Sequence, residues 1–131
     1  MDEGAVREWF EDYLSAFAAS GRGERTAADV APFFSAPFLL TTDEVVVWLR
    51  AGDEVASWAQ TQVEGMLAAR YDHSETLSSD ITILNRNTAV HRASFSRRRA
   101  DGEEISVLTV TYVICGGSES YRICALALHT P

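Results

Sequence analysis

His91, Tyr13 and Asp43 are the residues of this 131-residue sequence best suited to acid–base chemistry. Histidine has an ordinary pKa of about 6.5, so it can accept and donate a proton near neutral pH. A tyrosine hydroxyl can donate a hydrogen bond to a carbonyl or enolate oxygen, and a carboxylate within reach of a proton can act as a general base. Together these residues predict proton transfer on a small organic molecule.

His91 lies in the segment 88–98, where apolar and polar side chains alternate. This alternation places His91 on the same strand face as Ala89, Ala93 and Phe95. The histidine is therefore either an ordinary core residue or a proton shuttle in a space that the small alanine side chains leave open.

Tyr13 and Asp43 also have two interpretations each. Tyr13 lies on the apolar face of a helix, so its hydroxyl either bonds a backbone carbonyl in the core or donates to a ligand. Asp43 lies between two strand-like runs, where aspartate favours a tight turn, or it leans over a pocket as a base. Tyr112 either complements Tyr13 in a pocket or packs in a sheet, and Thr109 lies on the opposite face from it.

The remaining polar clusters favour structural roles. Residues 72–75 hold two acids and a histidine in a polar stretch that is typical of a solvated turn. Arg97-Arg98-Arg99 resembles a phosphate site, but alternation turns Arg98 away from its neighbours and acidic residues follow at 101–104. We therefore expect ion pairs at the end of a hairpin.

The two cysteines flank a turn that begins at Gly116-Gly117. A loop centred near Ser118 would place Cys124 opposite Val113, offset from Cys115 along the hairpin. We therefore expect free thiols rather than a disulfide, and no metal site, because too few soft ligands are present.

The composition excludes several classes of protein. All eleven basic residues are arginine, so no lysine is present to form a Schiff base. Nineteen acidic residues give a net charge of −8, which repels nucleic acid and anionic lipid. No apolar run reaches the roughly 20 residues of a membrane span, and the acidic N-terminus lacks an export signal. We expect a cytoplasmic protein without nucleic-acid or membrane partners.

Helical periodicity dominates the first half of the chain. Apolar residues recur at helical spacing over residues 3–20, and a short helix is expected from Thr26 to about Pro32. A third and longest helix begins near Gly52, and Gln62 is the one polar member of its apolar face. These helices should cover a single face of a sheet.

Strands and tight turns fill the rest of the chain. Residues 38–42 and 44–49 are predicted to form a hairpin. The segments 79–84, 88–98, 105–115 and 121–129 are separated by turns containing glycine or asparagine and predict an antiparallel meander.

The last strand is apolar at every position of residues 123–128, which is typical of a strand covered on both faces. Since the helices cover only one face, we expect the other face to meet a second copy of the chain in a twofold dimer.

The segments 13–21, 34–40 and 121–126, together with the order of elements, resemble the NTF2-like superfamily, in its SnoaL-like and ketosteroid-isomerase-like branch. The resemblance covers nearly the whole chain and implies a single cone-shaped α+β domain, with three N-terminal helices packed on a curved antiparallel sheet. It also implies an apolar pocket, which members use for isomerisation, cyclisation, dehydration or hydrolysis, or only for binding.

Ketosteroid isomerases use a helix-one tyrosine, an aspartate base and a protonated aspartic acid on a late strand. The resemblance places Tyr13 at the tyrosine position and Thr42 at the base position, with Asp43 one residue further on. The late-strand acid falls near Val110, which cannot donate a proton. These differences argue against a simple ketosteroid isomerase.

Two functions therefore remain open. The first is an enzyme, without cofactor or metal, that acts on a small apolar organic molecule through Tyr13, Asp43 and His91. The second is a module that binds a ligand or a protein without chemistry. In either case the expected pocket wall consists of Trp9, Phe17, Phe34, Trp58, Met66, Phe95 and Tyr112.

Overall fold

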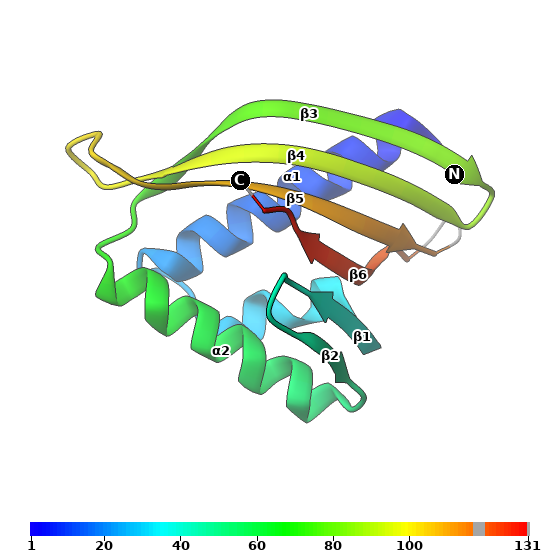
Figure 1. Ribbon diagram of the computed structural model, residues 1–131, viewed down its shortest axis with the longest axis horizontal. Coiled ribbons are helices and arrows are strands. Elements are labelled where there is room, and N and C mark those ends of the chain that lie inside the picture. The colour runs from blue at the N-terminus through cyan, green and yellow to red at the C-terminus, as the bar shows by residue number, and fades with distance from the viewer. Residues whose placement is uncertain (117–119, 131) are drawn as a thin grey trace.

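The computed structural model describes residues 1–116 and 120–130 of the chain. Within these residues, two α-helices and six strands follow one another (Figure 1). They are α1 (Glu3–Gly21), β1 (Phe34–Thr41), β2 (Val46–Leu49), α2 (Gly52–Ala68), β3 (His73–Asn85), β4 (Thr88–Arg98), β5 (Glu104–Cys115) and β6 (Arg122–Leu128).

The two long helices form where the apolar periodicity predicts them. Helix α1 begins after Asp2, whose carboxylate accepts a hydrogen bond from the Gly4 amide at 3.2 Å and caps the helix. The inward residues of α1 include Val6, Phe10 and Tyr13, all buried. The inward residues of α2 are Val55, Ala59, Val63 and Met66, whereas the neighbouring Leu67 is 44% exposed.

The predicted second helix is instead two single 3₁₀ turns, Ala27–Asp29 and Ala31–Phe33. Asp29 accepts a hydrogen bond from the Thr26 amide at 3.3 Å and closes the first turn. Pro32 has no amide hydrogen to donate, so the helical hydrogen-bond ladder does not continue through it. The chain then enters β1 directly at Phe34.

The strands form one six-stranded sheet in the order β2-β1-β6-β5-β4-β3. The hairpin β1–β2 and the meander β3–β6 are antiparallel, as predicted. The pairing of β1 with β6 is parallel, which corrects the expectation of a purely antiparallel sheet. This pair joins segments that lie far apart in the sequence, so local turn signals carry no information about its direction.

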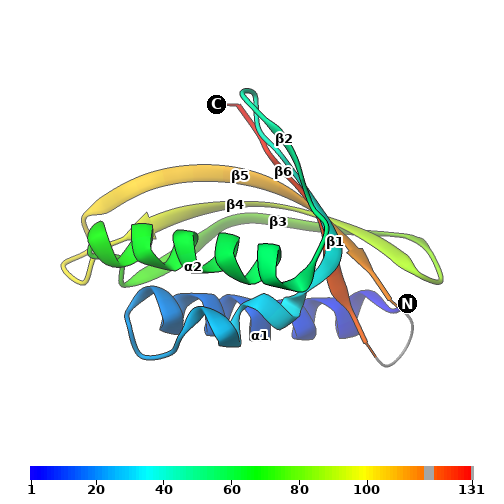
Figure 2. The same ribbon diagram turned by 90° about the horizontal axis from the view of Figure 1, so that it is seen from below.

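Both α-helices lie on the same side of the sheet, and β1, β2 and β6 bend away from the plane of β3–β5 (Figure 2). The predicted inward face of β4 is confirmed, because Ala89, His91, Ala93 and Phe95 are all buried. The curved sheet and the helices therefore enclose a cone whose interior contains the core.

Cys115 and Cys124 are free thiols, and the Cys124 thiol donates to the Val113 carbonyl oxygen at 3.4 Å. Burial raises the pKa of Cys124 to about 12, so its thiol stays protonated at neutral pH. The tip of the turn predicted between them, including Ser118, lies outside the described residues.

Neither described helix has the length and apolar character that a membrane-spanning helix requires.

Candidate functional site

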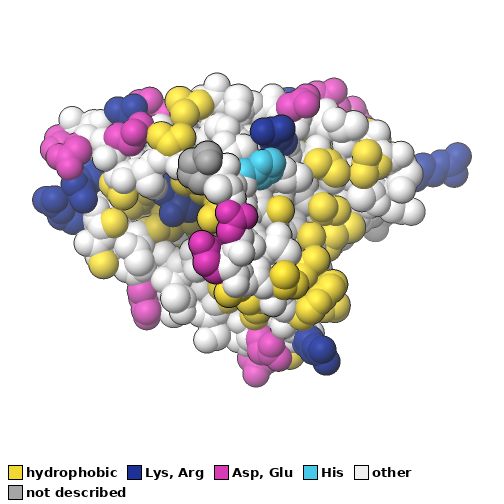
Figure 3. All heavy atoms as spheres, viewed as in Figure 1, with side chains coloured by type: hydrophobic (Ala, Val, Ile, Leu, Met, Phe, Trp, Pro, Cys, Tyr) yellow, Lys and Arg dark blue, Asp and Glu magenta, His cyan; other side chains and the backbone are white. Residues whose placement is uncertain are grey.

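A cavity of about 430 Å³ lies inside the cone between the two helices and the inner face of the sheet. Its walls are mainly aromatic and aliphatic side chains from α1, α2, β1, β4, β5 and β6. Its polar lining, besides two tyrosine hydroxyls, comes from Thr42, Gln62, Ser74, Arg97 and Ser106. Figure 3 shows a hollow in the surface with hydrophobic and arginine side chains around it.

The regular spacing of each element aims its side chains into this cavity. Tyr13 and Phe17 are one helical turn apart on α1, and Trp58 and Gln62 are one turn apart on α2. On β5, Leu108, Val110 and Tyr112 alternate with residues of the outer face. Thr109, on that outer face, hydrogen-bonds Ser94 instead, as expected from the alternation.

Tyr13 and Tyr112 both line the cavity and lie close to each other. Both side chains are buried, and their ring centroids lie 6.2 Å apart in an edge-on arrangement. Burial raises the pKa of Tyr13, an effect that the Arg97 guanidinium partly offsets. Burial also raises the pKa of Tyr112, and the neighbouring Tyr13 adds to the effect. Both hydroxyls are therefore protonated at neutral pH and can act only as neutral hydrogen-bonding groups.

Arg97 is the one charged side chain among the described residues that line the cavity. It follows Phe95 on the inward face of β4 and lies directly between Ser74 of β3 and Ser106 of β5 in the sheet register. Its guanidinium carbon is 5.5 Å from the centroid of the Phe17 ring, within cation–π range.

A second cavity of about 130 Å³ adjoins the larger one beside Arg97. Gln62, Arg97 and Ser106 line both cavities, and Met66 and Tyr71 line the smaller one. Hydrogen-bonding groups are thus concentrated where the cavities meet, while the larger cavity is mostly apolar.

His91 does not line either cavity, although its side chain points into the cone. Its Nε2 atom hydrogen-bonds the Ser79 hydroxyl at 2.8 Å, and its ring lies 4.2 Å from that of Phe10. Burial, and to a smaller extent the positive charge of Arg7, lowers the pKa of His91 to about 4. The histidine is therefore neutral at physiological pH and packed in the core.

The space expected beside the small residues of β4 is occupied in the fold. Ala89 and Ala93 are fully buried and line neither cavity. Phe10 of α1 packs against both His91 and Tyr112, with ring centroids 4.2 and 4.8 Å away. Of Trp9, Tyr13, His91 and Phe95, the structure places Tyr13 and Phe95 in the lining of the larger cavity.

Asp43 is exposed and lies outside the cavity lining. Its carboxylate accepts a hydrogen bond from the Thr130 hydroxyl. Thr42 does line the cavity, and its hydroxyl oxygen accepts hydrogen bonds from the amides of the following turn, which fixes the turn geometry.

The residues predicted to form the pocket wall divide into three groups. Phe17, Trp58, Phe95 and Tyr112 line the larger cavity, and Met66 lines the smaller one. Phe34 is core, with its ring 4.9 Å from that of Phe38. Trp9 packs at the other end of α1 against Phe33 and Tyr121.

Some lining residues were not among the predicted site residues. The acidic residues after Arg97 predict ion pairs for it, but extending the alternation of β4 by one step past Phe95 places it on the inner face. Gln62 was visible as the polar exception on the apolar face of α2. Leu126 and Leu128 line the cavity as well, and the sequence pattern alone does not assign them to a face.

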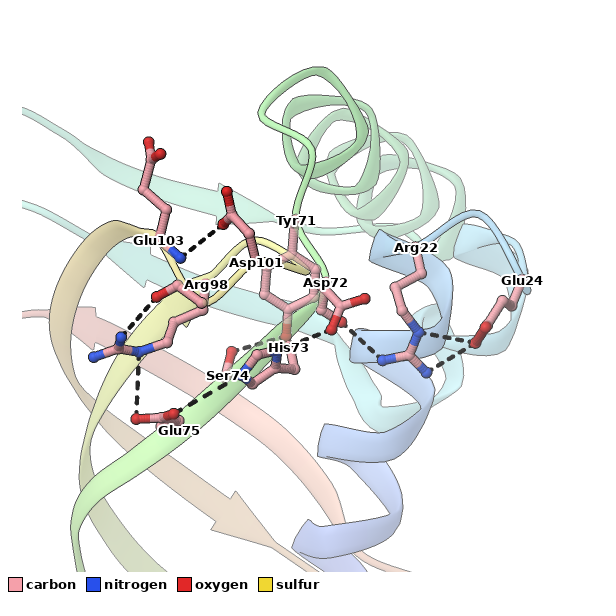
Figure 4. A network of polar contacts seen from close by, with 11 residues as sticks. Arg22, Glu24, Tyr71, Asp72, His73, Ser74, Glu75, Arg98, Asp101 and Glu103 are labelled. Carbon is pink, nitrogen blue, oxygen red and sulfur yellow. Dashed lines mark hydrogen bonds and ion pairs between the residues drawn. The ribbon is translucent and has the colours of Figure 1, made fainter.

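The polar stretch 72–75 takes part in a network of polar contacts, which Figure 4 shows. His73 Nδ1 lies 2.8 Å from an Asp72 carboxylate oxygen, and Arg98 Nε lies 3.3 Å from Glu75. These side chains are partly exposed, but the prediction of a turn was wrong, because His73 to Glu75 form the first residues of strand β3 and pair with the end of β4. No group of three or more metal-ligating side chains occurs in the part of the chain that the structure describes.

A curved sheet and helices that enclose an apolar cavity in this topology define the NTF2-like, or cystatin-like, α+β fold. Residues 2–131 match the family described as NTF2-like protein (DUF6841), and the chain belongs to that family. None of the curated proteins matches the chain.

Solved structures with low sequence identity share the fold. A Nostoc punctiforme domain of unknown function with a cystatin-like fold has a TM-score of 0.70 at 19% identity, covering 99% of this chain and 77% of that one. An NTF2-like protein from Novosphingobium aromaticivorans has a TM-score of 0.71 at 12% identity, covering 97% and 80%. The yeast UBP3-associated protein BRE5 has a TM-score of 0.68 at 11% identity, covering 95% of each chain.

Proposed function

We propose that this domain binds a small, largely apolar organic molecule inside its cone without transforming it. The observation that carries the proposal is the cavity of about 430 Å³ with mainly aromatic and aliphatic walls and a few polar groups. Ligand pockets in proteins typically have volumes of about 300 to 1,000 Å³ and this kind of lining.

The absence of acid–base groups from the lining favours binding over catalysis. Among the described residues, no carboxylate and no imidazole lines the cavity. Thr42 and Val110, which hold the positions of the base and the acid in the resemblance to ketosteroid isomerases, do line it, and neither can exchange a proton at neutral pH. His91 and Asp43 both lie outside the lining.

The neutral dye N-phenyl-1-naphthylamine tests this proposal, since its fluorescence rises in apolar surroundings. We expect saturable binding at one site per chain. Leu108→Trp adds bulk to a residue that lines the cavity and should weaken binding at least about tenfold by excluding the dye.

Leu84→Trp is the matched control, because Leu84 is 57% exposed on β3 and lines neither cavity. This variant should bind the dye like the unmodified protein. Non-saturable fluorescence, or equal binding by the two tryptophan variants, would contradict an internal binding site. Thermal unfolding of both variants separates loss of the site from loss of the fold.

A second candidate is an enzyme of the SnoaL-like or ketosteroid-isomerase-like type that acts on a carbonyl compound. The buried pair Tyr13 and Tyr112, beside the Arg97 guanidinium, favours it, because phenol donors of this kind stabilise a developing oxyanion. The two candidates differ in one observable: the bound molecule is released unchanged in the first and transformed in the second.

A further inference from the structure

Arg97 differs from the two arginines that follow it in the charges around it. Arg98 lies 3.3 Å from Glu75 and 3.6 Å from Glu104, and Arg99 pairs with Glu103. Among the described residues, no carboxylate lies within ion-pair distance of Arg97. Figure 4 shows Arg98 directed toward Glu75. Because side chains alternate along a strand, Arg97 lies on the opposite face of β4 from Arg98.

The surroundings of Arg97 are aromatic rather than acidic. Its guanidinium lies over the Phe17 ring and acts electrostatically on the hydroxyls of Tyr13, Tyr71 and Tyr112, lowering the pKa of each against the effect of burial. Neither cavity that Arg97 lines includes an acidic residue among its described walls. Partial burial removes some of the water around the Arg97 cation, and no protein carboxylate compensates for this loss of solvation.

We propose that the ligand of this cavity carries a carboxylate group, which Arg97 binds while the apolar part of the ligand fills the larger cavity. The inference rests on the proposed binding function and names the chemical class that the site selects. The planar guanidinium offers paired N–H donors that match the two oxygens of a carboxylate. The tyrosine hydroxyls can donate to the same anion as neutral groups.

The polar groups on either side of Arg97 support this orientation. Ser74 and Ser106 are its direct neighbours in the sheet register, and Gln62 faces it from α2 across the region where the cavities meet. These side chains can accept or donate the hydrogen bonds that a carboxylate and its attached water require. Leu40 and Leu126, which are register partners on β1 and β6, add apolar wall to the larger cavity that suits a hydrocarbon or ring.

The chain as a whole has a net charge of −8, so its long-range field does not attract anions. Preference for a carboxylate must therefore arise from local contacts, since charges separated by more than about 8 Å are largely screened at physiological ionic strength. Consequently, increasing salt should weaken the interaction much less than removing the Arg97 charge does.

The test compares 2-naphthoate with 2-naphthamide, which share one ring system and differ in the charge of a group of similar shape. Calorimetric titration should show the carboxylate binding about tenfold or more tightly to the unmodified protein, equivalent to about 1.4 kcal/mol. In Arg97→Gln the carboxylate should lose this advantage, and Arg97→Lys should restore part of it.

Arg98→Gln is the matched control, because it removes the same charge one residue further along β4 from a side chain that lines neither cavity. It should retain the preference for the carboxylate. Equal affinity of the two naphthalene compounds for the unmodified protein would overturn the carboxylate inference and leave the binding function standing. Failure of both compounds and of the neutral dye to bind would overturn the binding function and the inference together. Equal loss of preference in Arg97→Gln and Arg98→Gln would also overturn the inference, because it would indicate a general charge effect.

Discussion

At the scale of single residues, the same side chain acquires different roles from the face on which it lies. Arg98 and Arg99 form ion pairs at the partly exposed end of a hairpin, and such pairs each contribute only about 0 to 1 kcal/mol. Arg97 lies inside the cone without such a partner. Its replacement should therefore affect ligand binding more than stability.

His91 links the stability of the fold to pH through its burial. In the unfolded chain its pKa is about 6.5, and in the folded protein burial lowers the pKa to about 4. Between these values the unfolded state binds more protons, so the stabilisation is fully present above about pH 6.5 and is lost as the pH falls toward 4.

Between about pH 7 and pH 4, we therefore expect the free energy of unfolding of the unmodified protein to fall more than that of His91→Gln. The difference between the two decreases should be on the order of 2 kcal/mol. Urea denaturation at several pH values measures this difference. Identical pH profiles for the unmodified protein and His91→Gln would contradict the prediction.

At the scale of elements, the end of α1 meets α2 and the start of β3 without room for a side chain. A methyl group at Gly21 would overlap Met66 Cε and lie 2.7 Å from Cδ1 of Tyr71. The Met66 side chain can move, but the Tyr71 ring is buried and its hydroxyl bonds Ser74 at 2.8 Å. This glycine thus allows the close approach that shapes the smaller cavity.

Gly21→Ala should accordingly lower the free energy of unfolding by about 1 to 3 kcal/mol, because the overlap forces a shift of the Tyr71 ring. Gly65→Ala provides the comparison within α2, since no atom lies within 4 Å of the added methyl group. That variant should be more stable by up to about 1 kcal/mol, from the higher helix propensity of alanine. Chemical denaturation of the two variants should give opposite signs, and a neutral or stabilising Gly21→Ala would show that the contact relaxes freely.

At the scale of the whole molecule, the outer face of the sheet has no helix over it (Figure 2). The register places Trp48 beside Leu39 and Leu39 beside Ala125, so these three side chains share this face. Val46 and Trp48 are 70% and 55% exposed, and Figure 3 shows hydrophobic side chains gathered over the β1–β2 hairpin. The large exposed apolar side chains of β2, next to a small side chain on β6, favour packing of this face against a second copy of the chain.

We expect a twofold dimer of about 29 kDa in light scattering, twice the 14.4 kDa of the chain. Trp48→Arg should shift the mass to that of one chain, because a charge in an apolar interface loses its solvation. Leu84→Arg introduces the same charge at another exposed apolar position and should remain dimeric. A monomeric unmodified protein would contradict the dimer, and a dimeric Trp48→Arg would place its interface elsewhere.

The sequence by itself determined the elements whose burial follows a local period. The 3.6-residue stripe predicted α1 and α2, and the alternation over Thr88–Arg98 predicted which β4 side chains are buried. Local periodicity suffices there because a regular helix or strand has one apolar face, whichever partner covers it. Pro32 marked the end of the short helical region, but the sequence could not distinguish one helix from two 3₁₀ turns, since both bury the same few apolar residues.

Only the tertiary structure decided which inward-facing residues border empty space. Phe10 from α1 fills the region beside His91, so the predicted proton shuttle is a core residue. Arg97, which lies further along the same face of β4, borders the cavity. The parallel pairing of β1 with β6 likewise depends on segments far apart in the sequence. The physical reason is that a cavity is the volume left between several elements, and no periodicity within one element encodes how closely another approaches it.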